Sequence, residues 1–237
     1  MNSSIIKAQN QVLKALCGKI DDFYLTGGTA LSVVYFQHRL SDDLDFFTQE
    51  FSRERVREIV GILVQAMKKE VSLLNQSTSK KALQLMIYSM KLGKGESLKI
   101  DFVQDVLPLL KPTKTIEGIK VLSLEDIYLR KIYAVSGAPS MLDEVGRGKA
   151  IGGRQEAKDL FDLYFLSHTF IRLSAFVNKY CKQLMREGLI RWFRTFDRMH
   201  MKADLAYIKT DKRIEFRDID KHITKEIDKI LEEELDL

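Results

Sequence analysis

The sequence predicts an α/β first half followed by an all-helical second half, with the change near residue 122. Two observations support this prediction. Before residue 122, short apolar stretches of strand length alternate with amphipathic helical stretches. From Ser123 onward, apolar residues recur at helical spacing. The 237 residues suffice to bury the core of one large domain or of two modest ones.

The composition is that of a globular protein, with 45% hydrophobic and 30% charged residues. No apolar run approaches the roughly 18 residues that span a bilayer, so no membrane association is expected. The N-terminus lacks the apolar region of a signal peptide, and Cys17 and Cys181 are too far apart to suggest a disulfide framework or a zinc site. We therefore expect a cytoplasmic protein. The net charge of +5 fits a nucleic-acid or nucleotide ligand, and fits ordinary surface charge as well.

The first half alternates helical and extended patterns. Glycines 93 and 95 flank Lys94 in a hairpin-type turn signal between two strands. The expected elements, in chain order, are a helix at 5–16, a strand at 23–25, a helix at 29–36, a strand at 42–47, an amphipathic helix at 53–69, and strands at 71–75, 82–90, 97–103 and 119–122.

The second half is expected to be helical. Ser123 is a favourable N-cap and Asp126 falls in the first turn after it. Residues 136–153 hold five glycines and predict a long flexible loop, and loops of that length are usually functional or disordered. Further helices are expected at 154–168, 171–187, 188–200 and 217–235.

Three aspartates suggest a metal site. Asp43 and Asp45 are two residues apart on a predicted strand, so their side chains leave the same face. Such a pair is best tolerated with a cation between the carboxylates, and Mg²⁺ prefers oxygen ligands. Asp101 lies within an apolar strand, where an acid needs a partner, and is a natural third ligand. The alternative is that the pair lies on a solvated strand end, as we expect for Asp42.

Gly27, Gly28 and Thr29 lie at the entrance of a predicted helix. Glycines let the backbone approach a ligand, and helix-entrance N–H groups bind phosphate. The hydroxyl of Thr29 could add a contact. The alternative is a plain tight turn. The P-loop pattern is absent, which argues against that class of nucleotide-binding protein.

A glycine pair with Ser or Thr, a spaced pair of aspartates and a later single aspartate together resemble the polymerase-β-type nucleotidyltransferase superfamily. The strings LTGGTAL at 25–31 and RLSDDLD at 39–45 resemble the AbiEii/AbiGii toxin family more specifically. EDIYLRK at 125–131 and RQEAKDLFDLY at 154–164 resemble two helical motifs of that family. The resemblance covers about residues 20–168, and the glycine-rich stretch between the helical motifs is longer than in the family.

The resemblance implies a nucleotidyltransferase core at residues 1–122, built on a mixed β-sheet flanked by helices. It also implies a helical domain at 123–237, a C-terminal helical bundle that closes the nucleotide cleft. It implies transfer of a nucleoside monophosphate from an NTP to an acceptor hydroxyl, with Mg²⁺ or Mn²⁺ as cofactor. Asp43 and Asp45 would hold the metal, and Asp101 would complete the site and help to deprotonate the acceptor. The residues it implies in nucleotide binding are Gly27, Gly28, Thr29, Ser41, Lys131, Arg154, Lys158, Asp159 and Asp162.

Spacing alone leaves the roles of the second group open. Arg154, Lys158 and Asp162 fall on one stripe if residues 154–168 form a helix, which would suit phosphate or an exposed Lys158–Asp162 ion pair. Lys131 in an apolar helix face is compatible with a triphosphate contact or with a snorkelling lysine.

The family also implies a toxin of a type IV toxin–antitoxin or phage-defence system, with a winged-helix antitoxin as partner and a tRNA 3′ end as preferred acceptor. One alternative is a small-molecule nucleotidyltransferase of the antibiotic-modifying kind. Another is a non-catalytic nucleotide- or RNA-binding module, against which the intact set of Asp43, Asp45 and Asp101 argues.

Overall fold

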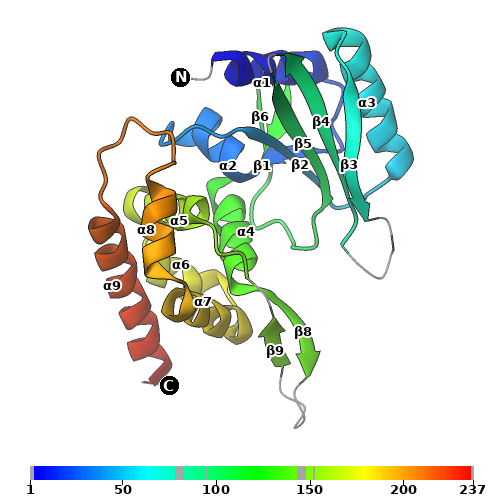
Figure 1. Cartoon of the computed structure of the whole chain (residues 1–237). Coiled ribbons are helices and arrows are strands. Elements are labelled where there is room, and N and C mark those ends of the chain that lie inside the picture. The colour runs from blue at the N-terminus through cyan, green and yellow to red at the C-terminus, as the bar shows by residue number, and fades with distance from the viewer. Residues whose placement is uncertain are drawn as a thin grey trace. The chain divides into compact units, whose positions relative to one another are not determined.

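The protein is described by a computed structural model that covers residues 3–77, 79, 83–93, 95–142, 148–151 and 153–235. The chain forms two compact units, Met1–Asp126 and Ile127–Leu237, drawn together in Figure 1. The boundary between these units falls inside helix α4 (Leu124–Ser136). The assignment of residues 1–122 to a transferase core and of 123–237 to a helical domain stays a prediction.

The first unit is built on a seven-stranded sheet in the order β3-β4-β5-β2-β1-β7-β6. The pairs β2–β5 and β1–β7 are parallel and the other pairs are antiparallel, so the sheet is mixed, as predicted. Its elements are α1 (Ser3–Leu16), β1 (Tyr24–Thr26), α2 (Gly27–Thr29), the π-helix η1 (Ala30–Tyr35), β2 (Asp43–Thr48), α3 (Arg53–Met67), β3 (Val71–Ser77), β4 (Leu85–Gly93), β5 (Glu96–Gln104), β6 (Lys114–Ile116) and β7 (Ile119–Val121).

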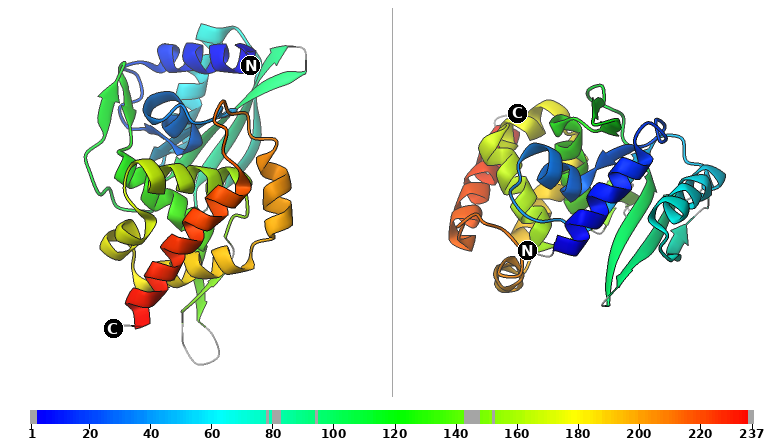
Figure 2. Two further views of the ribbon diagram at one scale, coloured as in Figure 1. Left: turned by 90° about the vertical axis from the view of Figure 1, so that its left-hand side faces the viewer. Right: turned by 90° about the horizontal axis from the view of Figure 1, so that it is seen from above.

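The core of this unit lies on one face of the sheet. Burial alternates along β2, where Leu44 and Phe46 are fully buried and their neighbours along the strand are only partly covered. Phe46 stacks on Phe102 of β5 with ring centroids 5.7 Å apart, and Phe23 meets the edge of Phe102 at 5.5 Å. Helices α1 and α3 pack against each other and contribute further apolar side chains to the core (Figure 2). The opposite face of β2 carries Asp43, Asp45 and Phe47.

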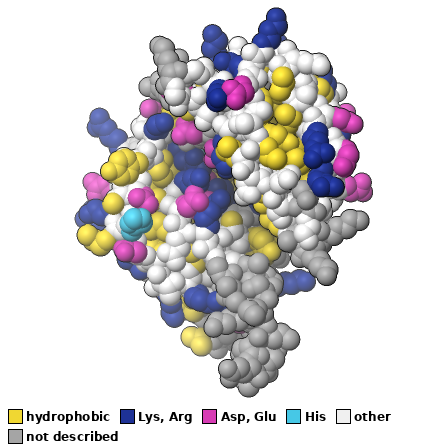
Figure 3. All heavy atoms as spheres, turned by 45° about the vertical axis from the view of Figure 1, so that its right-hand side comes forward, with side chains coloured by type: hydrophobic (Ala, Val, Ile, Leu, Met, Phe, Trp, Pro, Cys, Tyr) yellow, Lys and Arg dark blue, Asp and Glu magenta, His cyan; other side chains and the backbone are white. Residues whose placement is uncertain are grey.

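The edge strand β3 presents an apolar surface. Leu73 and Leu74 of β3 and Val64 of α3 are exposed, and apolar side chains are visible on the surface of this unit in Figure 3. At the other end of the sheet, β6 was not predicted. It pairs with β7 across a turn in which Glu117 and Gly118 both have positive φ. The three residues of β6 are all exposed, so the strand shows no alternation of buried apolar residues.

Helix α4 begins as predicted. The N–H of Asp126 donates to the hydroxyl of Ser123 at 3.1 Å, and the Asp126 carboxylate accepts from the N–H groups of Leu110 and Lys111. These bonds lie within the first unit. The cap satisfies a helix N–H group that has no partner inside the helix.

The second unit is mainly helical. After α4 it contains β8 (Ala138–Leu142), β9 (Gly148–Ile151), α5 (Ala157–Thr169), α6 (Leu173–Tyr180), α7 (Gln183–Thr195), α8 (Arg198–Leu205) and α9 (Phe216–Leu235). Tyr128 of α4 stacks on Phe176 of α6 with centroids 4.2 Å apart, at the centre of its core. Among the described residues, no single helix is long and apolar enough to cross a membrane. Helices α5 and α6 together reach that length and hydropathy, but with a bend of 93° between them.

The predicted flexible loop at residues 136–153 is wrong for its described part, because β8 and β9 pair as an antiparallel hairpin. Residues 143–147 and 152 of the predicted loop lie outside the described residues, as do residue 82 of a predicted strand and Lys94 of the turn between β4 and β5. The glycine content predicts a loop. The pairing of β8 with β9 depends on backbone hydrogen bonds, which amino-acid composition does not reveal.

Two predicted helices are broken before their predicted ends. The helix expected at 171–187 ends at Tyr180, because Cys181 and Lys182 are extended. The helix expected at 188–200 is interrupted at Phe196 and Asp197, and Asp197 caps α8 by accepting from the N–H of His200. Apolar spacing continues across both breaks, so periodicity alone does not reveal them.

Candidate active site

Three predicted aspartates lie on one face of two neighbouring strands. Strand β2 runs parallel to β5, and the register places Asp45 beside Asp101 and Asp43 beside Lys99. Asp43 and Asp45 are partly exposed, whereas Asp101 is 9% exposed. This register brings together residues far apart in the sequence, and the alternation of the strands turns all three carboxylates away from the apolar core.

Lys99 belongs to the same carboxylate face. Its Nζ lies 2.7 Å from Oδ2 of Asp101. Burial acts to lower the pKa of Lys99, but the hydrogen bond to Asp101 and the charges of Asp101, Asp43 and Asp45 outweigh it, so its pKa is raised. Lys99 was not among the predicted site residues, because only the folded strand places its ammonium group against Asp101.

The glycine pair forms the first turn of the helix, where the sequence analysis expected it to precede the helix. Helix α2 begins at Gly27 and continues into η1, in which the N–H of Phe36 donates to the carbonyl of Leu31, five residues earlier. Gly27 has φ +70°, and a Cβ there would lie 2.2 Å from Oδ2 of Asp45. Glycine at this position therefore lets the backbone approach the Asp45 carboxylate.

The second glycine makes room for an arginine that sequence reasoning did not assign to the site. A Cβ on Gly28 would lie 2.3 Å from Nη2 of Arg39. Arg39 is 7% exposed and donates through Nη1 to the carbonyl of Leu40 at 2.9 Å. Arg39 begins the RLSDDLD string, so its place in that string was the available signal.

The backbone that enters β2 is held by three side chains. The fully buried Thr29 hydrogen-bonds the carbonyl of Asp43 and, at 2.9 Å, the hydroxyl of Ser41. Gln9 of α1 donates through Nε2 to the carbonyls of Ser41 at 2.8 Å and Asp43 at 3.0 Å. Thr29 and Ser41 thus fix the position of Asp43 from within the protein. Gln9 has the same effect but was not predicted, because nothing in its sequence context marks it.

The second predicted group forms a buried ionic cluster inside the helical unit. Lys131 of α4 places Nζ 2.9 Å from Oδ1 of Asp159 and 2.7 Å from Oδ2 of Asp162, both on α5. Both aspartates are fully buried and Lys131 is nearly so. A snorkelling lysine would turn its ammonium group to solvent, whereas that of Lys131 is buried against two acids. The triphosphate contact stays a prediction. Lys131 is the counter-ion of two internal acids.

Arg154 completes this cluster from outside the helix. It was predicted to share a helical stripe with Lys158 and Asp162, which is wrong because α5 begins only at Ala157. Arg154 donates from Nε to Oδ2 of Asp159 at 2.5 Å and from Nη2 to Oδ1 at 2.7 Å. Trp192 donates to the Arg154 carbonyl at 3.0 Å. The guanidinium is therefore oriented by a bidentate pair, while 43% of the side chain stays exposed.

The electrostatics of the cluster favour the ionised form of Asp159. Burial acts to raise the pKa of Asp159, but the charges of Lys131 and Arg154 and their hydrogen bonds outweigh it, so this pKa lies below its usual value. Lys158 does not pair with Asp162. It lies 2.9 Å from Glu156 in a surface pair, with 42% of its side chain exposed.

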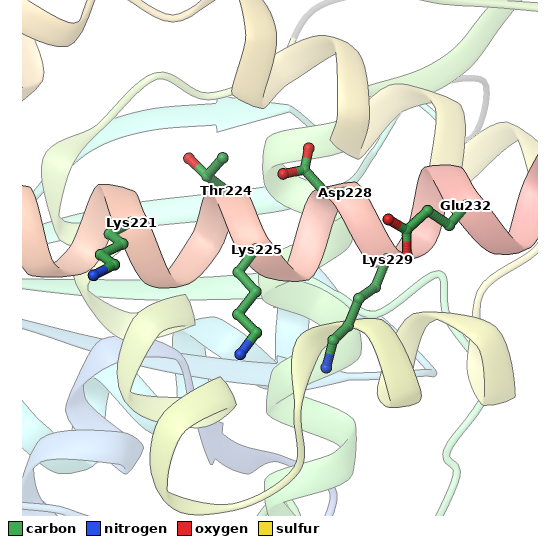
Figure 4. A pocket seen from close by; sticks show the side chains of 6 residues that line it. All are labelled: Lys221, Thr224, Lys225, Asp228, Lys229 and Glu232. Atoms are coloured by element: carbon green, nitrogen blue, oxygen red, sulfur yellow. The ribbon is translucent and has the colours of Figure 1, made fainter.

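No group of three or more His, Cys, Asp or Glu within the described ranges is arranged closely enough to form a metal site as it stands. The donor chemistry of the carboxylate face still suits a hard cation, since it offers oxygen atoms from Asp43, Asp45 and Asp101 on one surface. An open pocket elsewhere runs along α9, lined by Lys221, Thr224, Lys225, Asp228, Lys229 and Glu232 (Figure 4). It contains none of the predicted site residues.

A family model described as nucleotidyl transferase AbiEii toxin, type IV TA system, matches residues 11–236, which is nearly the whole chain. The chain belongs to the AbiEii nucleotidyltransferase toxin family. The predictions of family and enzyme class are thereby confirmed. The AbiEii-family protein is a nucleotidyltransferase toxin of a type IV toxin–antitoxin system, for which an NTP substrate and an antitoxin partner follow from the family.

Solved structures share the fold of this AbiEii toxin. JHP933 from Helicobacter pylori is 18% identical with a TM-score of 0.57, covering 100% of this chain and 97% of its own. A putative nucleotidyltransferase from H. pylori is 16% identical with a TM-score of 0.60, covering 98% of both chains. The nucleotidyltransferase toxin MenT4 from Mycobacterium tuberculosis is 14% identical with a TM-score of 0.56, covering 96% of this chain and 82% of its own. No curated protein matches the chain. At these identities the structures bear on the fold alone, and they confirm the predicted fold class.

Because Gly27 fits tightly against Asp45, we expect its substitution to destabilise the AbiEii toxin. Gly27→Ala should lower the free energy of unfolding by about 1–2 kcal/mol from the left-handed backbone alone. Contact with Asp45 should add to that loss. Urea unfolding monitored by circular dichroism measures the total loss of unfolding free energy.

Gly61→Ala is the matched control, because it makes the same chemical change in the same unit. Gly61 is exposed in the middle of α3, and a Cβ there meets nothing within 4 Å. This substitution should stabilise the protein by about 0.5–1 kcal/mol. Equal effects of the two substitutions would show that Gly27 is not confined by Asp45.

Proposed function

We propose that this AbiEii toxin transfers a nucleoside monophosphate from an NTP to a tRNA 3′ end, releases pyrophosphate and depends on Mg²⁺ or Mn²⁺. The observation that carries the proposal is the parallel register of β2 and β5, which gathers Asp43, Asp45 and Asp101 on one face beside Gly27. Carboxylates so arranged are typical of phosphoryl-transfer sites, where charge must be balanced as bonds to phosphorus change.

The carboxylate face suits the proposed metal. Asp43 and Asp45 would hold it and Asp101 would complete the site, because Mg²⁺ and Mn²⁺ favour carboxylate oxygens. The absence of a side chain at Gly27 leaves space next to Oδ2 of Asp45 that any Cβ would fill. When bound, Mg²⁺ supplies polarisation of the phosphoryl oxygens and neutralises developing charge. Asp101 is the residue that we assign to accepting the proton of the acceptor hydroxyl.

In the first unit, the proposed phosphate contacts come from the backbone. The N–H groups of Gly27 and Gly28 at the start of α2 would bind phosphate oxygens. Thr29 and Ser41 serve the same turn through the hydrogen bonds that hold the entrance of β2. This assignment gives the glycines direct contact and the hydroxyls a positioning role.

The cations of the helical unit would balance phosphate charge. Arg154 and Lys158 are the partly exposed members, and we assign the direct contacts to them. Lys131, Asp159 and Asp162 would act through Arg154, because Asp159 orients its guanidinium and Lys131 balances both acids. The nucleotide-binding role implied for these three residues thus becomes one of positioning.

The proposal also covers the acceptor molecule, the type of antitoxin and the cellular compartment. The net charge of +5 is compatible with a polyanionic RNA acceptor. We propose a winged-helix antitoxin on the family resemblance, and a cytoplasmic location because NTPs and tRNA are present together there.

A transfer assay tests the proposal. The purified protein is incubated with each of the four NTPs, labelled at the α-phosphate, together with Mg²⁺ and total RNA. We expect label on the 3′ end of tRNA-sized molecules, and loss of labelling with EDTA. A parallel reaction with a metabolite pool instead of RNA separates out the small-molecule alternative. Absence of label from every reaction would contradict the proposed activity.

A further inference from the structure

Lys99 occupies a place for which the proposed reaction has given no role. It projects from β5 onto the carboxylate face, directly beside Asp43 in the register of β2 and β5. Its Nζ contacts Oδ2 of Asp101 at 2.7 Å. A cationic side chain thus lies among the three carboxylates that we assign to metal binding.

The two partners of this ion pair differ in freedom. The side chain of Asp101 is 12% exposed and that of Lys99 is 41% exposed. A nearly buried carboxylate is costly without a compensating charge, and two further carboxylates on the same face add repulsion. A lysine supplies a compact charge on a flexible four-carbon stem, unlike the rigid fork of arginine. Lys99 can therefore turn its ammonium group to solvent while Asp101 stays where the strand places it.

We propose that Lys99 is the resident counter-ion of the carboxylate face, which holds Asp101 when no divalent cation is bound and releases it when one binds. The exchange replaces one N–H···O hydrogen bond at Asp101 with coordination to the cation. Lys99 keeps its proton and moves to solvent, and no covalent bond changes. This inference rests on the proposed divalent-cation dependence, so its test must separate the two.

Binding of Mn²⁺ alone, measured as loss of the free-ion signal in electron paramagnetic resonance, is the central test. Lys99→Met keeps the apolar stem and removes the competing charge. It should bind Mn²⁺ about three- to tenfold more tightly than wild type, because cation binding no longer displaces a partly exposed ion pair. A merely structural role for Lys99 would leave this affinity unchanged or weaken it, and either result overturns the inference.

Lys91→Met is the matched control for loss of one positive charge. Lys91 also lies 2.7 Å from a carboxylate, that of Glu70, but both side chains are mostly exposed at the surface. Its Mn²⁺ affinity should equal that of wild type. An equal gain in Lys91→Met and Lys99→Met would show a general charge effect and overturn the specific role of Lys99.

Binding of Mn²⁺ to Asp45→Asn distinguishes failure of the inference from failure of the proposed function. If wild type and Asp45→Asn bind Mn²⁺ equally, the proposed metal site is wrong and the exchange is refuted with it. If Asp45→Asn abolishes binding while Lys99→Met changes nothing, only the role of Lys99 is refuted.

A stability measurement without metal tests the ion pair itself. In EDTA, Lys99→Met should lower the urea midpoint, and in the background of Asp101→Asn it should no longer do so. Additive effects of the two substitutions would contradict the counter-ion role.

Discussion

Replacing Asp45 with asparagine is expected to slow nucleotide transfer by roughly 10³-fold, equivalent to about 4 kcal/mol of transition-state stabilisation. Asparagine preserves the size of the side chain and one oxygen, but it removes the charge beside Asp101 and Gly27. Initial rates of label transfer to RNA at saturating NTP measure the loss. Circular dichroism of the same samples verifies that the variant is folded.

Asp42→Asn is the control for this prediction. It makes the same chemical change three residues closer to the N-terminus than Asp45, at an exposed residue just before β2. The sequence already suggested that Asp42 is a bystander, and its substitution should leave the transfer rate within about twofold of wild type, as is usual for a solvated surface residue. Similar rates for Asp42→Asn and Asp45→Asn would reject the assignment of roles within the DDLD string.

Replacing Lys131 with methionine is expected to destabilise the helical unit by about 3–5 kcal/mol. The substitution removes the charge that lies 2.9 Å from Asp159 and 2.7 Å from Asp162, and leaves two fully buried carboxylates with one counter-charge fewer. The single tryptophan of the chain, Trp192, belongs to this unit and bonds to the Arg154 carbonyl. Its fluorescence during urea unfolding therefore reports on the unit directly.

The control for Lys131 is Lys158→Met, which removes a lysine whose pair with Glu156 is at the surface. Its effect should not exceed about 0.5 kcal/mol. A double variant, Lys131→Met with Asp162→Asn, should recover part of the lost stability, since one buried charge disappears with its partner. If Lys131→Met and Lys158→Met have equal effects, the buried cluster contributes no special stability.

The effect of Lys131→Met should also depend on pH. In wild type the pKa of Asp159 lies below its usual value of about 3.9, so its stabilisation is present above that pH and is lost as pH falls through the lower, folded-state pKa. Without Lys131 the carboxylate of Asp159 accepts a proton more readily, which relieves the uncompensated charge. The difference in unfolding free energy between wild type and variant should be largest near pH 7 and should narrow below about pH 4.

Periodicity in the sequence was enough to predict the α/β first half and the strands that carry the three candidate aspartates. Alternation in residues 42–47 and 97–103 assigned Asp43, Asp45 and Asp101 to polar strand faces, because side chains alternate strictly along a strand. Local pattern could not supply the pairing of β2 with β5, which depends on the complete sheet. For the same reason Lys99 appeared as an ordinary polar residue until the register placed it beside Asp43.

The helical unit shows where pattern reasoning stopped. Lys158 and Asp162 have the spacing of an ion pair, yet Asp162 pairs with Lys131 from another helix. Arg154 has helical spacing from Lys158 but precedes α5. A buried carboxylate needs a nearby positive charge. Packing between helices, rather than distance along the chain, decides which cationic side chain lies close enough to supply it.

The sequence by itself determined the family, the enzyme class, the mixed α/β first half and the aspartates that we propose for catalysis, because short-range alternation and motif spacing are written directly in the order of residues. The tertiary structure decided which groups meet: Gly27 with Asp45, Lys99 with Asp101, and Lys131 with two aspartates of α5. Such contacts follow from strand register and helix packing, which arise only when the whole core is assembled.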